Sequence, residues 1–221
     1  MANRSYLYSL TSQPSSFDDV PERITGLTEA NYSVPFVASL LVSTHPSITA
    51  SLFAPVLTHD DGTEMTKLPA LCAAMAPGVE RLERFLAALR AATPGNDQLH
   101  READSALMFL AEHRRRYVQL ETIELAMMSV ENQADLDALI AEHRAEAVAV
   151  GEAVDALPDD TEEAGRLLAD ALVSGEGVFS VFRGLPLDDQ RGPDNQPLGL
   201  SYWSTNLYWS LRGTAERQAD Q

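Results

Sequence analysis

The residues best suited to hold a metal ion are three histidines in segments of helical character, His100, His113 and His143. A carboxylate stands three residues before a histidine at Asp97, a spacing that di-iron helical bundles use in two copies with two further carboxylates. The chain has no second such pair and no His-Glu-x-x-His motif. We therefore predict that it binds no metal. Asp97 is expected to cap a helix, and His100 to be solvated or to pair with Asp104.

Motifs for hydrolysis and nucleotide binding are also absent from the sequence. It contains no Gly-x-Ser-x-Gly motif, and its one lysine, Lys67, has no glycine neighbour to help cradle a phosphate. Cys72, the only cysteine, lies in an apolar run and is expected to be a small buried hydrophobic residue. The three arginines at 114–116 would fan around a helix by about 100° each, so they cannot face one ligand and are expected to pair with acids. We predict no catalytic residue and no cofactor, and the missing motifs favour a binding protein over an enzyme, which remains the alternative.

The strongest functional signal is a block of acidic residues between Arg116 and Arg166. A single arginine, Arg144, opposes thirteen acids: Glu121, Glu124, Glu131, Asp135, Asp137, Glu142, Glu146, Glu152, Asp155, Asp159, Asp160, Glu162 and Glu163. Charge of one sign on one helix and its flanks attracts a basic protein and speeds its encounter. We therefore predict an acidic binding surface that contains Glu131, Asp135, Glu142, Glu146 and Glu152. The alternative is an ordinary solvated outer face.

The charge of the whole chain limits its partners in the same way. Its 16 Lys and Arg residues oppose 33 Asp and Glu residues, which gives a formal net charge of −17. Such a chain repels the phosphates of nucleic acids and the anionic surface of membranes, so we predict neither as a partner. No signal peptide is visible, the apolar stretch at 34–57 is interrupted by His45-Pro46, and one cysteine cannot form an internal disulfide. A cytoplasmic location and a basic protein partner are the expectations, and homo-oligomers remain open.

Aromatic residues gather at both chain ends and form a second candidate site. Residues 2–9 alternate weakly, as in a short strand, and residues 200–211 are rich in tyrosine and tryptophan. If the two segments pair, one small sheet would carry rigid aromatic rings and an arginine, which are typical of binding hot spots. The candidate binding residues are Arg4, Tyr6, Tyr8, Trp203, Asn206 and Tyr208. The alternative is a small aromatic core that seals one end of the molecule.

The elements expected to position these residues are mainly helical. From Pro77 onward, apolar residues recur every three or four positions, with breaks near Pro94 and Pro158. We predict a mainly α fold in a single domain over 1–221: an antiparallel helical bundle with its core at about 34–175. Helices are expected at 36–43, 47–53, 79–92, 97–130, 132–157 and 164–173. A small β element is expected from 2–9, 178–183 and 200–211, with a helix as the alternative for 200–211.

Both chain ends also carry a family resemblance. The opening Met1-Ala2-Asn3-Arg4-Ser5-Tyr6-Leu7-Tyr8-Ser9 resembles the start of an uncharacterised family of bacterial proteins. The ending Gly199-Leu200-Ser201-Tyr202-Trp203-Ser204-Thr205-Asn206-Leu207-Tyr208 resembles the C-terminal pattern of that family, a Trp-Ser pair followed by Leu-Tyr. The specific similarity covers about a tenth of the chain. It implies a bacterial source and no particular activity.

Three functions are consistent with these features. The first is an acidic protein-interaction module of the toxin-neutralising or adaptor type, which binds a basic partner. The second is a small-molecule binder or enzyme with its site among the chain-end aromatic residues. The third is a self-associating structural module. The acidic block and the missing catalytic motifs favour the first.

Overall fold

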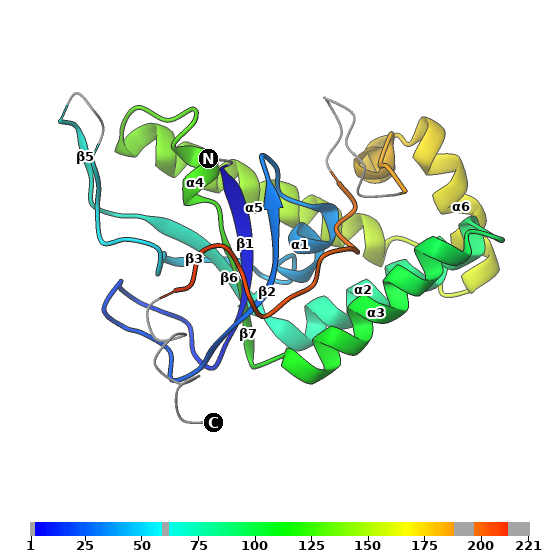
Figure 1. The fold of residues 1–221 in the computed structure, drawn as a ribbon. Coiled ribbons are helices and arrows are strands. Elements are labelled where there is room, and N and C mark those ends of the chain that lie inside the picture. Colours follow the sequence, from blue (N-terminus) through cyan, green and yellow to red (C-terminus); the bar gives the residue numbers. More distant parts are fainter. Residues whose placement is uncertain (1–2, 59–61, 188–196, 212–221) are drawn as a thin grey trace.

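The computed structural model describes residues 3–58, 62–187 and 197–211 (Figure 1). At its centre is a five-stranded antiparallel sheet with the strand order β2-β1-β7-β6-β3. The five strands are β1 (Arg4–Leu10), β2 (Ile24–Asn31), β3 (Ser47–Ala50), β6 (Pro69–Ala74) and β7 (Tyr117–Glu121). A separate two-stranded sheet joins β4 (Leu57–Thr58) to β5 (Glu64–Met65).

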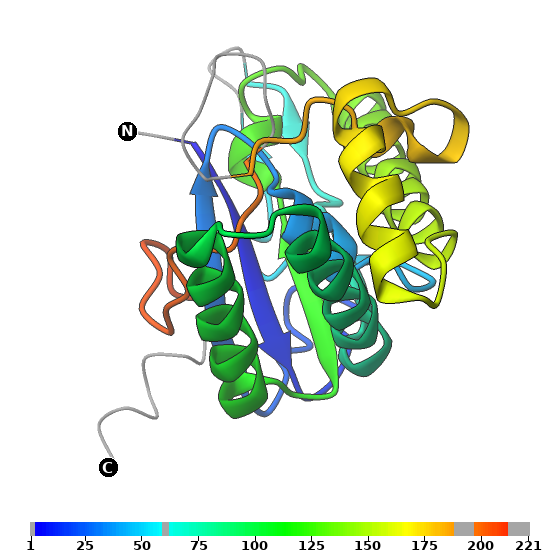
Figure 2. The ribbon, with the colours of Figure 1, turned by 90° about the vertical axis from the view of Figure 1, so that its right-hand side faces the viewer.

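Helices pack beside the five-stranded sheet, and all of those described except the short helix at Ile123–Ala126 lie on one side of it. They are α1 (Phe36–Leu41), α2 (Met75–Ala92), α3 (Asp97–His113), α4 (Ile123–Ala126), α5 (Gln133–Asp155) and α6 (Thr161–Ser174), followed by the 3-10 helix η1 (Gly177–Phe182). Figure 2 shows α2 and α3 side by side across the sheet, with α5 and α6 beside them. Of the described residues, 45% lie in helices and 17% in strands, so this is an α/β fold. The predicted mainly α bundle is wrong.

The two faces of the sheet differ because successive side chains of a strand point to opposite sides. Leu7, Val118 and Leu120 face the helices and belong to the main hydrophobic core. The opposite face carries Tyr6 and Tyr8, which pack with Leu52 and Leu211 in a separate, smaller cluster. Segments from 51–53 and 207–211 cover this second face, and the short helix α4 lies at its edge, where Glu124 contacts Tyr6 (Figure 1).

The helical periodicity was informative where a helix packs on the core. The predicted stripe of α2 is buried: Val79, Leu82, Phe85, Leu86 and Leu89. Helix α5 likewise buries Leu136, Ile140, Ala147, Val150 and Val154. Asn132 caps α5, because its Oδ1 accepts the N–H groups of Ala134 and Asp135. Asp160 Oδ1 accepts the Glu163 N–H at 2.8 Å and caps α6.

The predicted helix at 97–130 is three elements. Helix α3 ends at His113, strand β7 follows, and α4 occupies only Ile123–Ala126. In β7, Val118 and Leu120 alternate with Gln119 and Glu121, which is the period of a strand. All four side chains are buried, so polar and apolar positions do not mark an outer and an inner face. Because both faces of β7 are buried, the strand could not be recognised from an amphipathic pattern.

Three further predicted elements differ. The segment expected as a helix at 47–53 contains β3, and the β segment expected at 178–183 is the 3-10 helix η1. Residues 200–211 are neither strand nor helix. The strand predicted at 2–9 is confirmed as β1, but it pairs with β2 and β7 rather than with the chain end. Among the described residues, no helix is long and apolar enough to cross a membrane.

Candidate functional site

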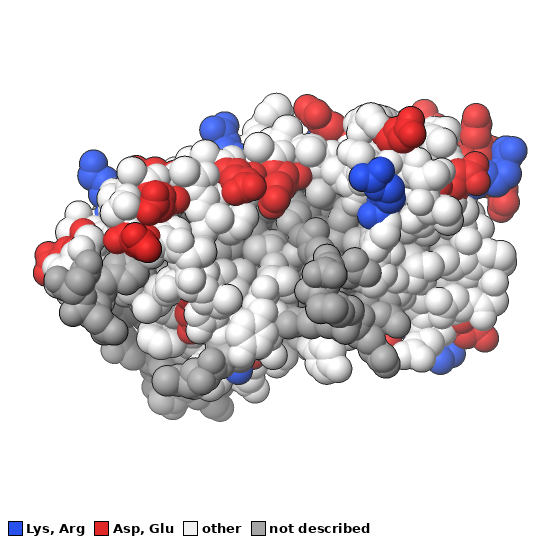
Figure 3. Space-filling model, turned by 90° about the horizontal axis from the view of Figure 1, so that it is seen from above, with Lys and Arg blue, Asp and Glu red and all other residues white. Residues whose placement is uncertain are grey.

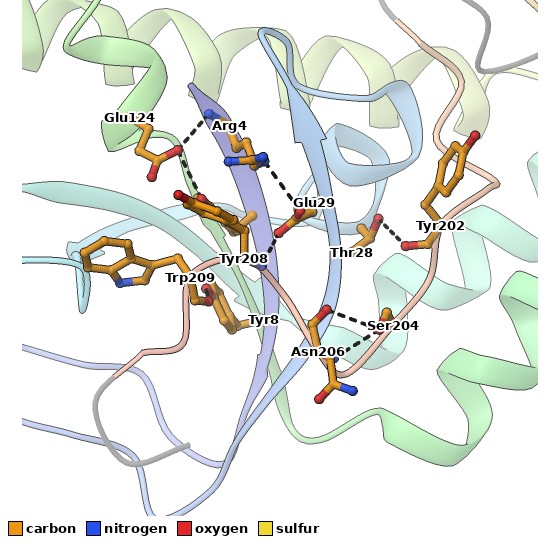
Figure 4. Close-up of polar contacts among 11 residues, drawn as sticks. Arg4, Tyr8, Thr28, Glu29, Glu124, Tyr202, Ser204, Asn206, Tyr208 and Trp209 are labelled. Carbon is orange, nitrogen blue, oxygen red and sulfur yellow. Dashed lines mark hydrogen bonds and ion pairs between the residues drawn. The ribbon is translucent and has the colours of Figure 1, made fainter. Parts of the chain in front are cut away.

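Residues from both chain ends, together with two glutamates from β2 and α4, form a cluster that we call the clasp. Its members are Arg4, Tyr6, Tyr8, Glu29, Glu124, Tyr208 and Trp209 (Figure 4). Arg4, Tyr6 and Tyr8 project from the same face of β1, and both of these tyrosines are only 1% exposed. The Arg4 guanidinium lies 4.0 Å above the centre of the Tyr208 ring, a cation–π contact. The first strand thereby meets the last described segment of the chain.

Two carboxylates outside the six predicted aromatic-site residues organise the clasp. Glu124 Oε2 accepts the backbone N–H of Arg4 at 2.9 Å and the hydroxyl of Tyr6 at 3.0 Å. Glu29 accepts the Tyr208 N–H at 2.6 Å and lies 3.5 Å from Arg4 Nε. Glu29 stands opposite Tyr6 in the β1–β2 register, so strand pairing brings it to the same face. Only this long-range pairing could have identified it.

The phenols of the clasp act as hydrogen-bond donors. Burial raises the pKa of Tyr6 far above its usual value, and the Glu124 carboxylate beside it adds to the effect. Burial also raises the pKa of Tyr8, whose hydroxyl donates to the Trp209 carbonyl at 2.7 Å. Both hydroxyls therefore keep their protons at neutral pH, which suits structural donors rather than bases or nucleophiles.

The structure brings four of the six predicted aromatic-site residues together and leaves two apart. Trp203 packs instead on Phe109 of α3, with ring centres 5.9 Å apart. Asn206 is exposed, and its N–H donates to Ser204 Oγ. The tryptophan of the clasp is Trp209, which stacks on Phe53 at 4.2 Å. Arg4, Tyr6 and Tyr8 line none of four surface cavities, of about 400, 450, 610 and 770 Å³, in the described part of the chain.

A buried polar cluster lies next to the clasp on the same face of the sheet. Glu121 is fully buried and accepts three hydrogen bonds, from Ser51 Oγ at 2.6 Å, Gln119 Nε2 at 2.7 Å and Leu52 N–H at 2.9 Å. Burial raises the pKa of Glu121, although these three donors act in the opposite direction. All three donors belong to the protein itself, so the cluster fastens the segment at 51–52 to β7.

Cys72 and the histidines carry little chemistry in this fold. Cys72 is buried as predicted, and burial raises the pKa of its thiol to about 11. Asn96, not Asp97, caps α3, and His100 contacts Thr93 Oγ1 at 3.3 Å. Within residues 3–58, 62–187 and 197–211, no group of three His, Cys, Asp or Glu side chains could hold a metal ion.

Two other predicted pairings differ from the structure. Asp104 pairs with Arg90 at 2.6 Å rather than with His100. The Arg116 guanidinium lies 5.2 Å from the Tyr117 ring centre, and no ion pair within the described ranges joins the arginines at 114–116 to an acid.

The acidic block divides into several environments. Glu121 is buried and Glu124 belongs to the clasp, so neither forms part of an outer surface. Asp155 and Asp159 pair with Arg81 and Arg84 of α2. The remaining acids are exposed, including all five that were predicted as a surface. Seen from the side of α4 and α5, acidic side chains outnumber basic ones (Figure 3).

Three of these acids share one side of α5. Spacings of seven and four residues place Asp135, Glu142 and Glu146 within about 40° of one another around the helix axis. Glu131 lies just before the helix, and Glu152 is turned about 120° away from Glu146. The Asp135–Glu146 side is therefore a stripe of like charge. Burial raises the pKa of Glu146, and the Glu142 carboxylate one turn away raises it further.

A cavity of about 400 Å³, here called the α5 groove, lies beside this stripe. Its lining combines apolar and polar side chains from three segments: Tyr32, Ser33, Val34, Leu125, Met128, Ser129, Leu139, His143 and Glu146. Tyr32 and Met128 are each 58% exposed, which is unusual for large apolar side chains that lie close together. Burial lowers the pKa of His143, so this ring is neutral at neutral pH.

Comparison with known proteins identifies the family and no function. Residues 11–171 match a family described as a domain of unknown function (DUF7822), and because this covers most of the chain, the protein belongs to that family. No curated protein and no solved structure matches the chain.

Proposed function

We propose that the protein is a non-enzymatic interaction module that binds a basic segment of a partner protein in the α5 groove. One observation carries the proposal: the stripe of Asp135, Glu142 and Glu146 borders a groove whose exposed walls are Met128 and Tyr32. Acids alone would describe a solvated face. Acids beside a groove with two exposed apolar side chains form a surface that can hold both parts of a basic amphipathic segment.

The groove suggests how such a segment would bind. An aliphatic or aromatic side chain would enter between Met128 and Tyr32, where the flexible methionine can adapt to its shape. Lysine or arginine side chains on either side would meet the carboxylates of Asp135, Glu142 and Glu146. These rim charges would mainly speed association, so binding would weaken as salt rises.

The biological setting is part of the same proposal. The charge of −17 supports an adaptor or toxin-neutralising role, and the resemblance of the chain ends supports a bacterial source, for which we infer a cytoplasmic location. A basic toxin or a basic regulatory protein would then be the natural partner.

A second candidate function is small-molecule binding near Trp203. A cavity of about 610 Å³ between α3 and residues 200–203 is lined by Arg101, Phe109 and Trp203, among others. Arg101 could bind a carboxylate there. The charge of the whole chain opposes anionic ligands, so we rank this function below the first. We rank self-association last, because two copies that each carry a net charge of −17 repel one another.

The proposal is tested by titrating the protein with a fluorescent amphipathic peptide of leucine and lysine at helical spacing. The triple variant Asp135→Asn, Glu142→Gln, Glu146→Gln is expected to bind about tenfold more weakly, since each rim charge contributes roughly 0.2–1 kcal/mol.

The matched control is Glu162→Gln, Glu163→Gln, Asp170→Asn on α6, which removes the same number of exposed acids away from the groove. Equal loss of affinity in both triple variants would show that only the total charge matters, and the groove would then have no role.

A further inference from the structure

The free edge of β2 is a second place where the molecule can bind a partner. β2 is the last strand of the sheet, so its outer side faces no other strand of the described residues. Two bonds show which of its residues point outward: Tyr32 N–H donates inward to Asn3 C=O, whereas Leu27 C=O accepts from Ser204 N–H on the outer side. Because outward and inward residues alternate, the backbone groups of Glu29 and Asn31 point to the free edge.

The C-terminal segment covers only the first part of this edge. Ser204 N–H bonds to Leu27 C=O at 3.0 Å, and Thr28 Oγ1 faces the Tyr202 carbonyl at 3.5 Å (Figure 4). Burial follows the same division: residues 26–28 are buried, Glu29 is half-buried and Asn31 is exposed. The C-terminal segment thus covers the edge of β2 at Leu27 and Thr28 and does not extend along the edge as far as Glu29.

A cavity of about 450 Å³ lies where the cover ends. It is lined by four consecutive strand residues, 28–31, together with Pro35, Pro197 and Tyr202. Consecutive strand residues point to opposite faces of a sheet, so a cavity that touches all four must lie along the strand edge. The Asn31 C=O accepts from Ser33 Oγ, and the Glu29 backbone groups and the Asn31 N–H have no partner among the described residues.

The wall opposite the strand is built around Tyr202. This residue has a φ of 66°, in the left-handed region that few non-glycine residues adopt, and its side chain is 82% exposed. Tyr202 therefore stands at the rim of the cavity as an uncovered aromatic ring, where it can contact the side chains of a strand laid along β2.

We propose that this edge binds an extended, basic segment of a partner protein, which adds to the sheet as a further strand. Its backbone would bond to the N–H and C=O of Glu29 and to the N–H of Asn31, the pairing used in strand addition. We infer a basic segment because this protein has a net charge of −17, which attracts positive charge. The same net charge disfavours a second copy of this protein as the added strand. The site does not depend on the α5 groove.

The test uses a fluorescent peptide of alternating valine and lysine and the variant Asn31→Pro. Proline removes the outward N–H of Asn31 and no bond of the β1–β2 ladder, because Asn31 does not bond to β1. We expect Asn31→Pro to weaken binding about tenfold, while Asn31→Ala, which keeps the N–H, binds as the wild type does. Amide hydrogen exchange should show new protection at Glu29 and Asn31 when the peptide binds.

A second peptide keeps the proposal testable if Asn31→Pro fails to fold. The same peptide with a methyl group on every backbone nitrogen cannot donate to the edge, so it should not bind the wild-type protein. Three results would overturn the proposal: no binding of the unmethylated peptide, equal binding by Asn31→Pro and Asn31→Ala, or protection at α5 or at Ile48 of the opposite edge strand instead of β2.

Discussion

The hydroxyl of Tyr8 donates to the backbone carbonyl of Trp209 at 2.7 Å, which ties the first strand of the protein to its last described segment. Tyr8 is buried, and Trp209 stacks on Phe53, so this bond joins three distant segments of the chain. The clasp is in this sense a structural closure, built from the residue types that are also common in binding sites.

Tyr8→Phe should therefore lower the stability of the protein. The variant keeps the buried ring and removes only the hydroxyl, so we expect a loss of about 1 kcal/mol in the free energy of unfolding. Denaturant unfolding followed by tryptophan fluorescence measures it. Tyr202→Phe, at an exposed ring, is the matched control and should change stability by less than about 0.5 kcal/mol. Equal effects of the two variants would show that the Tyr8–Trp209 hydrogen bond does not stabilise the protein.

The clasp also depends on a glycine that lets the C-terminal segment approach the sheet. A Cβ atom at Gly26 would lie 2.8 Å from Leu207 Cγ and 2.9 Å from the Thr205 carbonyl oxygen. We expect Gly26→Ala to displace residues 205–207 and to destabilise the protein by about 1–3 kcal/mol. Limited proteolysis should then cut near residue 205 more readily than in the wild type. An unchanged unfolding midpoint and an unchanged cleavage pattern would contradict the close contact.

These contacts show what the sequence could and could not predict. The core faces of α2 and α5 were predictable because each buries one side of a long helix, and that side repeats every three to four residues. The clasp residues on β1 were predictable as candidates because aromatic residues cluster at the chain end. Their partners Glu29 and Glu124 were not, since strand register and the position of α4 bring them in from distant segments.

β7 was missed for a related reason. Its polar residues Gln119 and Glu121 are buried and bonded to each other, so they do not mark a solvent face. Nothing local distinguishes such a strand from the end of the preceding helix. Without β7 the central sheet could not be predicted, and the N-terminal strand was paired with the C-terminal segment instead of with β7 and β2.

The buried carboxyl group of Glu121 makes a prediction about pH. Burial raises its pKa in the folded protein above the ordinary value of 4.5. At a pH between these two pKa values, the folded protein therefore holds a proton that the unfolded chain has lost. The stability from this group is fully present below the unfolded pKa and is lost as pH rises through the folded pKa. Glu121→Gln cannot titrate, so its stability relative to the wild type should increase as pH rises from about 4 to about 8.

Thermal unfolding of the two proteins over that pH range measures the effect, and the slope with pH matters rather than the absolute difference. Ser51→Ala provides a second check. It removes a donor that holds the pKa of Glu121 down, so the loss of stability should extend to higher pH in this variant than in the wild type. A difference between Glu121→Gln and wild type that does not vary with pH would contradict the raised pKa.

Met128 distinguishes a binding role of the α5 groove from a structural one. Its side chain is 58% exposed and lines the groove, so Met128→Ser should leave the free energy of unfolding within about 0.5 kcal/mol of the wild type. The same variant should bind the leucine–lysine peptide about tenfold more weakly, since an apolar anchor contributes roughly 1–2 kcal/mol at an interface. Met108→Ser is the matched control, because Met108 is 68% exposed on α3 and lines none of the four cavities. If the two serine variants bind the peptide equally well, the peptide does not occupy the groove, and the acidic side of α5 is then only a solvated surface.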